Sequence, residues 1–331
     1  MQILNLRFGY IVPFLVFFFL FSIHDVRASH GPGTGGATTV PAITLKKEAF
    51  SLGLRTEWTE FESISRSRIL EKAEQSGSHF DAVDRTFLHT AELGYGVTDD
   101  LTLGLIIGWF ESINFREAES DHDHAHDHGH DEAGILRGDP DGITDLWLFG
   151  KYRFYRGPQG HWAVLAGIKF PTGEEDKENS AGEKIEPGDQ PGSGSYDFLA
   201  GLAYSRWLTK EWTLDTNIQY IFRTEGSRDF KVGDRMDWNL AMAYQIIPRN
   251  TYPNIAPVGE INVRYLFRDE ENGRDEPNSG GTTVFLSPGI RLGITPHLNA
   301  GALVSFPVFQ NLLGEQLETD FKVTVTVGYN F

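Results

Sequence analysis

The chain ends on Phe321-Lys322-Val323-Thr324-Val325-Thr326-Val327-Gly328-Tyr329-Asn330-Phe331, a stretch in which apolar and polar residues alternate without a break. A period of two places the apolar side chains on one face of a β-strand and the polar ones on the other. A strand that is apolar along one whole face suits a barrel wall that contacts lipid. The stretch therefore predicts that the chain ends inside the wall of a membrane-spanning β-barrel.

Earlier segments show the same alternation and follow one another as hairpins. Phe50 to Trp58 is the first, and Phe87 to Val97 is joined to Leu101 to Phe115 by the turn Thr98-Asp99-Asp100. Asp is common in such tight turns. With the last stretch, these segments make about 12 strands, and bacterial barrels have an even number. The predicted fold is all-β, a transmembrane antiparallel β-barrel of about 12 strands.

Short turns alternate with long polar segments, which lie at residues 63–84, 117–142, 172–195 and 269–281. Outer-membrane barrels have short turns on the periplasmic side and long extracellular loops, so both termini are expected in the periplasm. The terminal Phe331 resembles the signal through which such barrels reach the barrel-insertion machinery, which is therefore a predicted partner. A soluble secreted β-sandwich is the alternative fold, but it does not require a closing aromatic strand.

The N-terminus has the pattern of a secretory signal. Arg7 precedes an apolar run from Phe8 to Ile23, and Val26-Arg27-Ala28 supplies small residues for cleavage after Ala28. The run is shorter than the roughly 20 residues that a spanning helix needs, which disfavours an anchor. We predict a signal peptide at 1–28, a flexible periplasmic leader at 29–45 and an outer-membrane β-barrel at 46–331. The predicted location is the bacterial outer membrane, after export.

The composition is compatible with that location. The chain has no cysteine, so its fold in an oxidising envelope requires no disulfide framework. A hydrophobic fraction of 40% is ordinary for a soluble protein, but a barrel exposes only alternate residues to lipid. The net charge of −17 disfavours nucleic acid as a partner, because neutralising phosphates needs a basic surface.

Three stretches carry a resemblance to a known family. They are Gly142-Ile143-Thr144-Asp145-Leu146-Trp147-Leu148-Phe149-Gly150-Lys151-Tyr152-Arg153, Gly167-Ile168-Lys169-Phe170-Pro171-Thr172-Gly173 and Gly192-Ser193-Gly194-Ser195-Tyr196-Asp197-Phe198. In order and spacing, the chain resembles the outer-membrane transporter family of the phenol-degradation meta-pathway type. The resemblance implies an outer-membrane channel for aromatic or other hydrophobic small molecules.

The inward register of the strands predicts a lumen lined with charges of both signs. Eight basic and seven acidic positions nearly cancel, so strong charge selectivity by the wall is not expected. These charges either brace the wall as ion pairs or line the path of a solute. The predicted lining is Arg55, Glu57, Glu92, Asp145, Lys151, Arg153, Lys169, Asp197, Asp215, Arg223, Asp237, Glu260, Arg264, Arg291 and Lys322.

The second extracellular loop, 116–141, is rich in His and Asp. Its histidines occupy every second position, so an extended backbone would place them on one side; they are His122, His124, His126, His128 and His130. Imidazole suits zinc, copper and nickel, and neighbouring carboxylates can complete a coordination shell. No other cofactor is expected. The alternative function is therefore a surface divalent-metal (Zn, Cu or Ni) binding or metal-uptake barrel.

Outside that loop and the signal, the histidines do not assemble with a nucleophile and an orienting group, so no enzyme is predicted. The sequence favours a passive channel for small hydrophobic or aromatic solutes. Its expected partners are outer-membrane lipid and the small-molecule solute.

Overall fold

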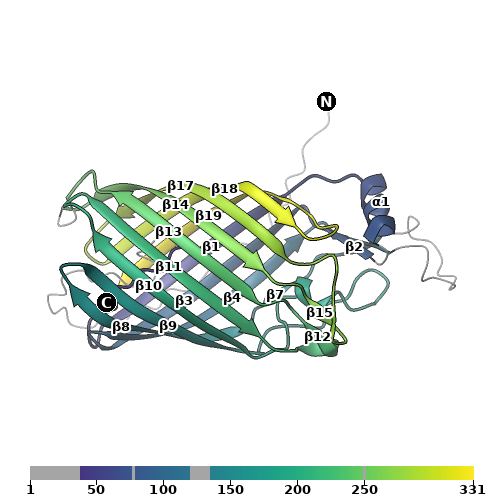
Figure 1. Ribbon diagram of the computed structural model, residues 1–331, viewed down its shortest axis with the longest axis horizontal. Coiled ribbons are helices and arrows are strands. Elements are labelled where there is room, and N and C mark those ends of the chain that lie inside the picture. Colours follow the sequence, from purple (N-terminus) through teal and green to yellow (C-terminus); the bar gives the residue numbers. More distant parts are fainter. Residues whose placement is uncertain (1–37, 77–78, 120–134, 249–250) are drawn as a thin grey trace, which may run out of the picture.

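The computed structural model describes residues 38–76, 79–119, 135–248 and 251–331. In this part of the chain, twelve long antiparallel strands form a closed barrel (Figure 1). The strands are, in order around the wall, β1 (Phe50–Phe61), β3 (Arg85–Thr98), β4 (Leu101–Ile113), β8 (Leu146–Gly157), β9 (Gly160–Phe170), β10 (Asp197–Trp207), β11 (Trp212–Arg223), β13 (Arg235–Tyr244), β14 (Asn254–Leu266), β17 (Gly281–Gly293), β18 (Leu298–Leu312) and β19 (Thr319–Asn330). The predicted fold class is confirmed.

The last strand closes the barrel. β19 pairs with β18 on one side and with β1 on the other, with Val325 opposite Thr56 and Val327 opposite Leu54. The amide of Phe331 donates to the carbonyl oxygen of Phe50 at 2.8 Å. Because β19 pairs on both sides, it has no free edge. A strand in the lipid core must be paired in this way, since no water is present there to satisfy its backbone groups.

Period-two alternation decides which side chains contact lipid. On β4, Leu105, Ile107 and Trp109 are exposed on the outer surface, whereas Thr102 and Ser112 are buried inside. The same division recurs on β19, where Val325 and Val327 are exposed. The sequence pattern therefore sorts each strand into a lipid-facing and a luminal face.

Aromatic side chains form a belt near each end of the barrel. At the end that holds the short turns, ring centroids lie 4.6 Å apart in Trp162–Tyr204 and 5.0 Å apart in Trp212–Tyr244. At the other end, Trp58 contacts Phe321 with centroids 5.6 Å apart. Such belts mark the two membrane interfaces of outer-membrane barrels.

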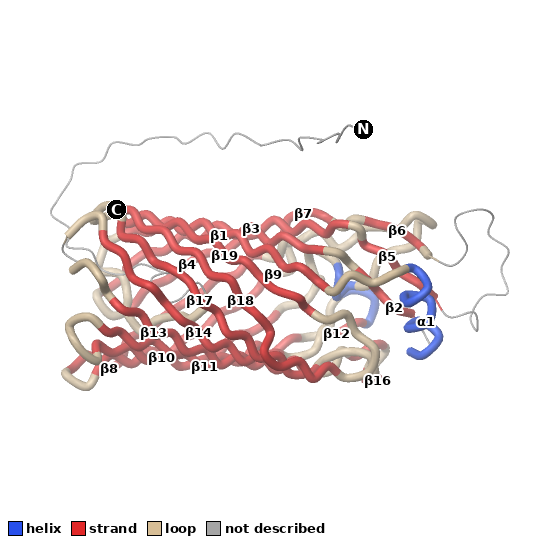
Figure 2. The backbone as a smooth tube through the Cα atoms, turned by 90° about the horizontal axis from the view of Figure 1, so that it is seen from above, coloured by secondary structure: helices blue, strands red, loops and turns tan. Residues whose placement is uncertain are grey.

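The two ends of the barrel differ in their connections. Short turns and the C-terminus share one end, which is periplasmic in this architecture, and long connections cover the other (Figures 1 and 2). The long connections contain elements of their own: α1 (Arg66–Ser76), β2 (His79–Ala82), β5 (Phe115–Glu119), β6 (Leu136–Gly138), β7 (Asp141–Ile143), the 3₁₀ turns η1 (Pro187–Asp189) and η2 (Ser227–Asp229), β12 (Phe230–Lys231), β15 (Glu270–Glu271) and β16 (Arg274–Asp275). α1 is too short and too polar to cross a membrane, and no other helix among the described residues is long and apolar enough to do so.

Part of the extracellular end is a small folded cap. β2, β5 and β6 form a three-stranded sheet, and α1 packs on it through Ile69 and Ala73. Phe80 and Ala118 supply apolar side chains from the sheet. The ends of the predicted loop 116–141 therefore fold as strands. The predicted metal ligands from His122 to His130 lie outside the described residues, as does the predicted signal peptide.

The structure corrects one predicted boundary. Residues 38–45, which the sequence assigned to a flexible periplasmic leader, lie inside the barrel. Thr39 is 2% exposed, Ala42 0% and Leu45 1%. The glycine-rich composition from Gly31 to Ala37 suggested flexibility for the whole leader, but the residues that follow it bury both apolar groups and backbone amides in the lumen. Residues 29–37 lie outside the described part of the chain.

Candidate functional site: the luminal chamber

The barrel lumen contains a cavity of about 590 Å³. Residues 38–41 bound it toward the periplasm, and residues 187–193 bound it toward the extracellular side. The latter belong to the connection between β9 and β10, residues 171–196, termed here the lid loop. The candidate site is thus a chamber in the bore with one chain segment at each end.

The N-terminal segment, residues 38–45, crosses the bore from wall to wall. The Leu45 amide donates to Thr102 on β4 at 2.8 Å, and the Thr39 hydroxyl donates to Glu260 on β14 at 2.9 Å. β4 and β14 are six strands apart in either direction around the barrel, so they lie on opposite walls. The segment therefore spans the full width of the lumen.

Hydrogen bonds hold the segment along its path. The Ala42 amide donates to the Ser205 hydroxyl at 2.9 Å, and the Val40 amide donates to the Asn217 side-chain oxygen, also at 2.9 Å. The Lys151 ammonium donates to the Pro41 carbonyl oxygen at 3.0 Å. Buried backbone groups need such partners, because an unpaired one costs about 1–3 kcal/mol. Luminal side chains thus replace the water that the segment gives up.

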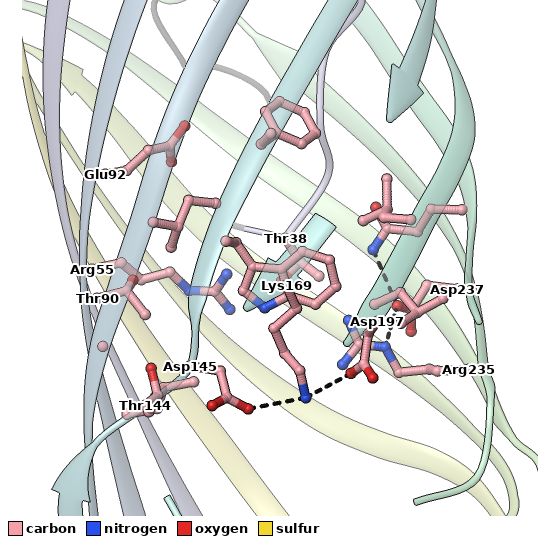
Figure 3. A pocket seen from close by; sticks show the side chains of 18 of the residues that line it. Thr38, Arg55, Thr90, Glu92, Thr144, Asp145, Lys169, Asp197, Arg235 and Asp237 are labelled. Atoms are coloured by element: carbon pink, nitrogen blue, oxygen red, sulfur yellow. Dashed lines mark hydrogen bonds and ion pairs between the residues drawn. The ribbon is translucent and has the colours of Figure 1, made fainter. Parts of the chain in front are cut away.

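The base of the lid loop is built around Lys169 (Figure 3). Its ammonium lies 3.0 Å from Asp145 Oδ2 and 2.7 Å from Asp197 Oδ2, and all three side chains are at least nine-tenths buried. Ser195 donates to the second oxygen of Asp197 at 2.8 Å. Each of the three stretches that carried the family resemblance contributes a side chain to this cluster. The cluster therefore brings the three stretches together in the structure.

Backbone contacts at the same place join the two ends of the lid loop. Asp145 accepts hydrogen bonds from the amides of Gly173 at 2.9 Å and Ser193 at 3.2 Å. A Cβ on Gly173 would lie 2.8 Å from the Cα of Gly192, closer than real Cβ atoms approach. Glycine is therefore required where the start and the end of the lid loop meet.

One wall of the chamber is charged. Asp237 lies 2.9 Å from both Arg235 and Arg264, and Gln219 donates to it at 3.1 Å (Figure 3). Arg55, which also lines the chamber, pairs with a carboxylate on its own strand, Glu57. Basic groups outnumber acidic ones in the lining, six to four. They are Arg55, Lys151, Lys169, Arg223, Arg235 and Arg264 against Glu92, Asp145, Asp197 and Asp237.

Apolar and aromatic side chains form a second part of the lining, termed here the apolar wall, on strands from β3 to β11 that also carry charged residues. It contains Leu88, Ile106, Phe110, Trp147, Phe149, Leu199 and Ile221. Trp147 lies opposite Ile106 in the pairing of β8 with β4, so these side chains form one continuous surface. The chamber therefore offers an apolar face and a hydrogen-bonding face to one small molecule.

The predicted luminal charges fall into two groups. Nine line the chamber: Arg55, Glu92, Asp145, Lys151, Lys169, Asp197, Arg223, Asp237 and Arg264. The other six lie beside it and contact other side chains or the N-terminal segment: Glu57, Arg153, Asp215, Glu260, Arg291 and Lys322. Glu260, for example, is 0% exposed beneath Thr39. Ion pairing and chamber lining are thus combined in the same residues.

Sequence reasoning missed three parts of the site. Arg235 was not among the predicted luminal charges, although the alternation extends from Asp237 back to Arg235. The lid residues 187–193 and the N-terminal segment show no periodic pattern. The residue types of Thr39, Val40 and Pro41 give no indication of the wall residues that they contact.

A closed twelve-stranded barrel with belts of aromatic residues and a luminal chamber defines an outer-membrane type of β-barrel. The model of the family described as "Putative MetA-pathway of phenol degradation" matches residues 125–310. The match covers more than half of the chain, and the chain belongs to this family. It also agrees with the resemblance seen in the sequence.

A solved structure shares the fold, and two others show a weaker similarity. An outer membrane channel from Pseudomonas putida F1 is 14% identical, with a TM-score of 0.58 over 88% of this chain and 98% of that one. The β domain of the Bordetella autotransporter BrkA is 9% identical, with a TM-score of 0.47 over 86% and 100%. The CymD monoaromatic hydrocarbon channel is 10% identical, with a TM-score of 0.41 over 86% and 88%. No curated protein matches the sequence.

Proposed function

We propose that the protein is a passive outer-membrane channel for small hydrophobic or aromatic solutes, with transport rather than catalysis as its role. The observation that carries the proposal is the chamber inside the closed barrel, which is lined by both apolar and charged side chains. The similarity in fold to an outer membrane channel from Pseudomonas putida F1 is compatible with it.

The size of the chamber supports a small solute. Its volume of about 590 Å³ is several times the roughly 150 Å³ cavity that holds benzene in an engineered protein core. It also falls within the range of small-molecule pockets. A single aromatic ring therefore fits with water beside it, whereas a folded protein does not.

The lining supports a solute with an apolar ring and one polar or anionic group. Trp147, Phe149 and Ile106 can contact the ring, while Arg235 and Arg264 can donate to the polar group. The excess of basic over acidic groups in the lining favours a phenol or an aromatic carboxylate over a cationic amine. A phenol-like solute satisfies both walls at once.

We expect the N-terminal segment to restrict conduction, because residues 39–45 cross the lumen from β4 to β14. We expect the mature protein to show small or infrequent current steps in planar bilayers. Deletion of residues 38–45 should increase the conductance several-fold. Equal conductance with and without the segment would contradict its role as a barrier.

Solute recognition can be tested by the block of ionic current. Benzoate and acetate carry the same charge, but only benzoate has a ring for the apolar wall. We expect benzoate to block at lower concentration than acetate, and Trp147→Ala to weaken that block at least fivefold. Trp162→Ala, on the lipid-facing surface of the neighbouring strand, is the matched control and should leave the block unchanged. A folded barrel that conducts no current under any of these conditions would overturn the proposed function.

A further inference from the structure

Three side chains at the extracellular end converge on one point. His79 and Asp81 project from the same face of β2, because they are two residues apart on a strand. Glu186 reaches them from the lid loop, immediately before η1. His79 Nε2 lies 3.7 Å from Asp81 Oδ2 and 3.6 Å from Glu186 Oε2, and all three atoms lie within 4.8 Å of one another.

This spacing suits a shared metal ion better than direct hydrogen bonds. Hydrogen bonds between nitrogen and oxygen have lengths of about 2.7–3.2 Å. Ligand atoms held about 2.0–2.2 Å from a tetrahedral ion are roughly 3.3–3.6 Å apart. The two measured distances from the imidazole nitrogen, 3.6 and 3.7 Å, lie at the upper end of that range and just above it. Small side-chain shifts would therefore bring the three atoms onto one ion.

An unsatisfied oxygen points to a missing ligand. Asp81 Oδ1 is inaccessible to solvent and has no hydrogen-bond partner in the described part of the chain. Buried carboxylate oxygens are normally satisfied, because an unpaired one is costly. Within the described residues, the only ion-pair partner of Asp81 and of Glu186 is His79.

Carboxylates outnumber basic groups at this point. Asp189, three residues after Glu186, lies close to Asp81, and His79 is the basic group paired with both Asp81 and Glu186 within the described residues. A dication would offset this concentration of carboxylates more completely than one imidazolium does.

We infer that His79, Asp81 and Glu186 form a divalent-metal site that fastens the lid loop to β2. One imidazole nitrogen with carboxylate oxygens suits Zn²⁺ or Mn²⁺. Glu186 directly precedes Pro187, the first lid residue that lines the chamber, so a bound ion would hold the extracellular boundary of the chamber in place. Binding of the ion does not depend on the proposed channel function.

Manganese is the probe that tests the site. Among first-row divalent ions, Mn²⁺ has the weakest affinity for imidazole and suits carboxylates, so it discriminates against the histidines from His122 to His130. Electron paramagnetic resonance titration of the refolded full chain should give one Mn²⁺ per molecule. His79→Ala and Glu186→Gln should each weaken binding at least tenfold. Glu183→Gln, an exposed carboxylate of the same loop, should leave it unchanged.

A second readout reports on the lid directly. Lys184 is exposed, but the following Ile185 is 1% exposed, so trypsin can cleave between them only after local opening. Mn²⁺ should slow that cleavage several-fold in the native protein and have no effect in Glu186→Gln. Absence of saturable binding would overturn the site. So would binding and protection in His79→Ala and Glu186→Gln that equal those of the native protein. These results are independent of whether the barrel conducts current.

Discussion

The two segments that bound the chamber are held by different chemistry. The lid loop is held by charge: Lys169 lies between two buried carboxylates, and Asp145 also accepts two amides of the loop. The N-terminal segment is held mainly by neutral hydrogen bonds to Ser205, Asn217 and Thr102. The lid is therefore part of the barrel wall, whereas the N-terminal segment occupies the bore as a separable strip of chain.

The difference shows which end of the chamber can open. Separating a buried charge from its partners leaves an uncompensated charge in a region of low dielectric constant and costs about 3–5 kcal/mol. A neutral hydrogen bond exchanged for one to water costs only about 0.5–1.5 kcal/mol. The N-terminal segment can leave its site by exchanging such bonds one at a time. We therefore expect the gating motion at the periplasmic end.

The largest effect is expected from removing the charge at the base of the lid. Lys169→Met keeps most of the side-chain volume but removes the cation that lies between Asp145 and Asp197. Asp145 then loses its ion-pair partner, and Asp197 keeps Arg223 at 3.9 Å, within the described residues. The free energy of unfolding should fall by about 3–5 kcal/mol, measured by guanidinium titration of the refolded barrel in detergent. Lys210→Met, in an exposed periplasmic turn, is the control. If the free energy of unfolding fell by less than about 1 kcal/mol, the lid loop would be held no more strongly by charge than the N-terminal segment is by neutral hydrogen bonds.

A smaller effect is expected from removing the Lys151 cation, which holds the N-terminal segment. Lys151 is 1% exposed and donates to the Pro41 carbonyl oxygen, a hydrogen bond of a charged group worth about 1.5–3 kcal/mol. In Lys151→Met, the segment should leave the bore more often, while unfolding of the barrel changes less than in Lys169→Met.

Cysteine labelling measures that release, since the chain has no cysteine of its own. Thr39→Cys introduces a thiol at a position that is 2% exposed, so a maleimide should label it slowly. Adding Lys151→Met should speed labelling by about tenfold or more, as the loss of 1.5–3 kcal/mol implies. Arg156→Met, an exposed residue near the end of the same strand, should not change the rate. Unchanged labelling in Lys151→Met would mean that the neutral contacts alone hold the segment.

The contrast between the two segments also explains what the sequence could predict. The barrel wall could be predicted because the alternation of apolar and polar residues is a local property of each strand. It can be recognised from the sequence alone in Phe321 to Phe331. The Lys169 cluster was close to prediction, because its residues lie in the quoted motifs and Lys169 is opposite both Trp147 and Asp197 in register. The N-terminal segment was not predictable, since Thr39 meets Glu260 across 221 residues with no periodic pattern to pair them.

The smallest effect is expected within the lid itself, where shape rather than charge is tested. Gly173→Ala places a methyl group 2.8 Å from the Cα of Gly192 and 2.9 Å from the Asp145 amide nitrogen. Overpacking of this kind costs about 1–3 kcal/mol. Gly188→Ala is the matched control in the same loop, because a Cβ there meets no atom within 4 Å. Both variants are compared by guanidinium titration.

If the lid is part of the wall, the cost of Gly173→Ala should appear as lost stability of the whole barrel, with the benzoate block of the current unchanged. If the lid moves during conduction, the added methyl group should instead displace the loop locally. The block would then change, while the unfolding midpoint of Gly173→Ala would match that of Gly188→Ala. The second result would assign the gating motion to the extracellular end and reverse the contrast between the two segments.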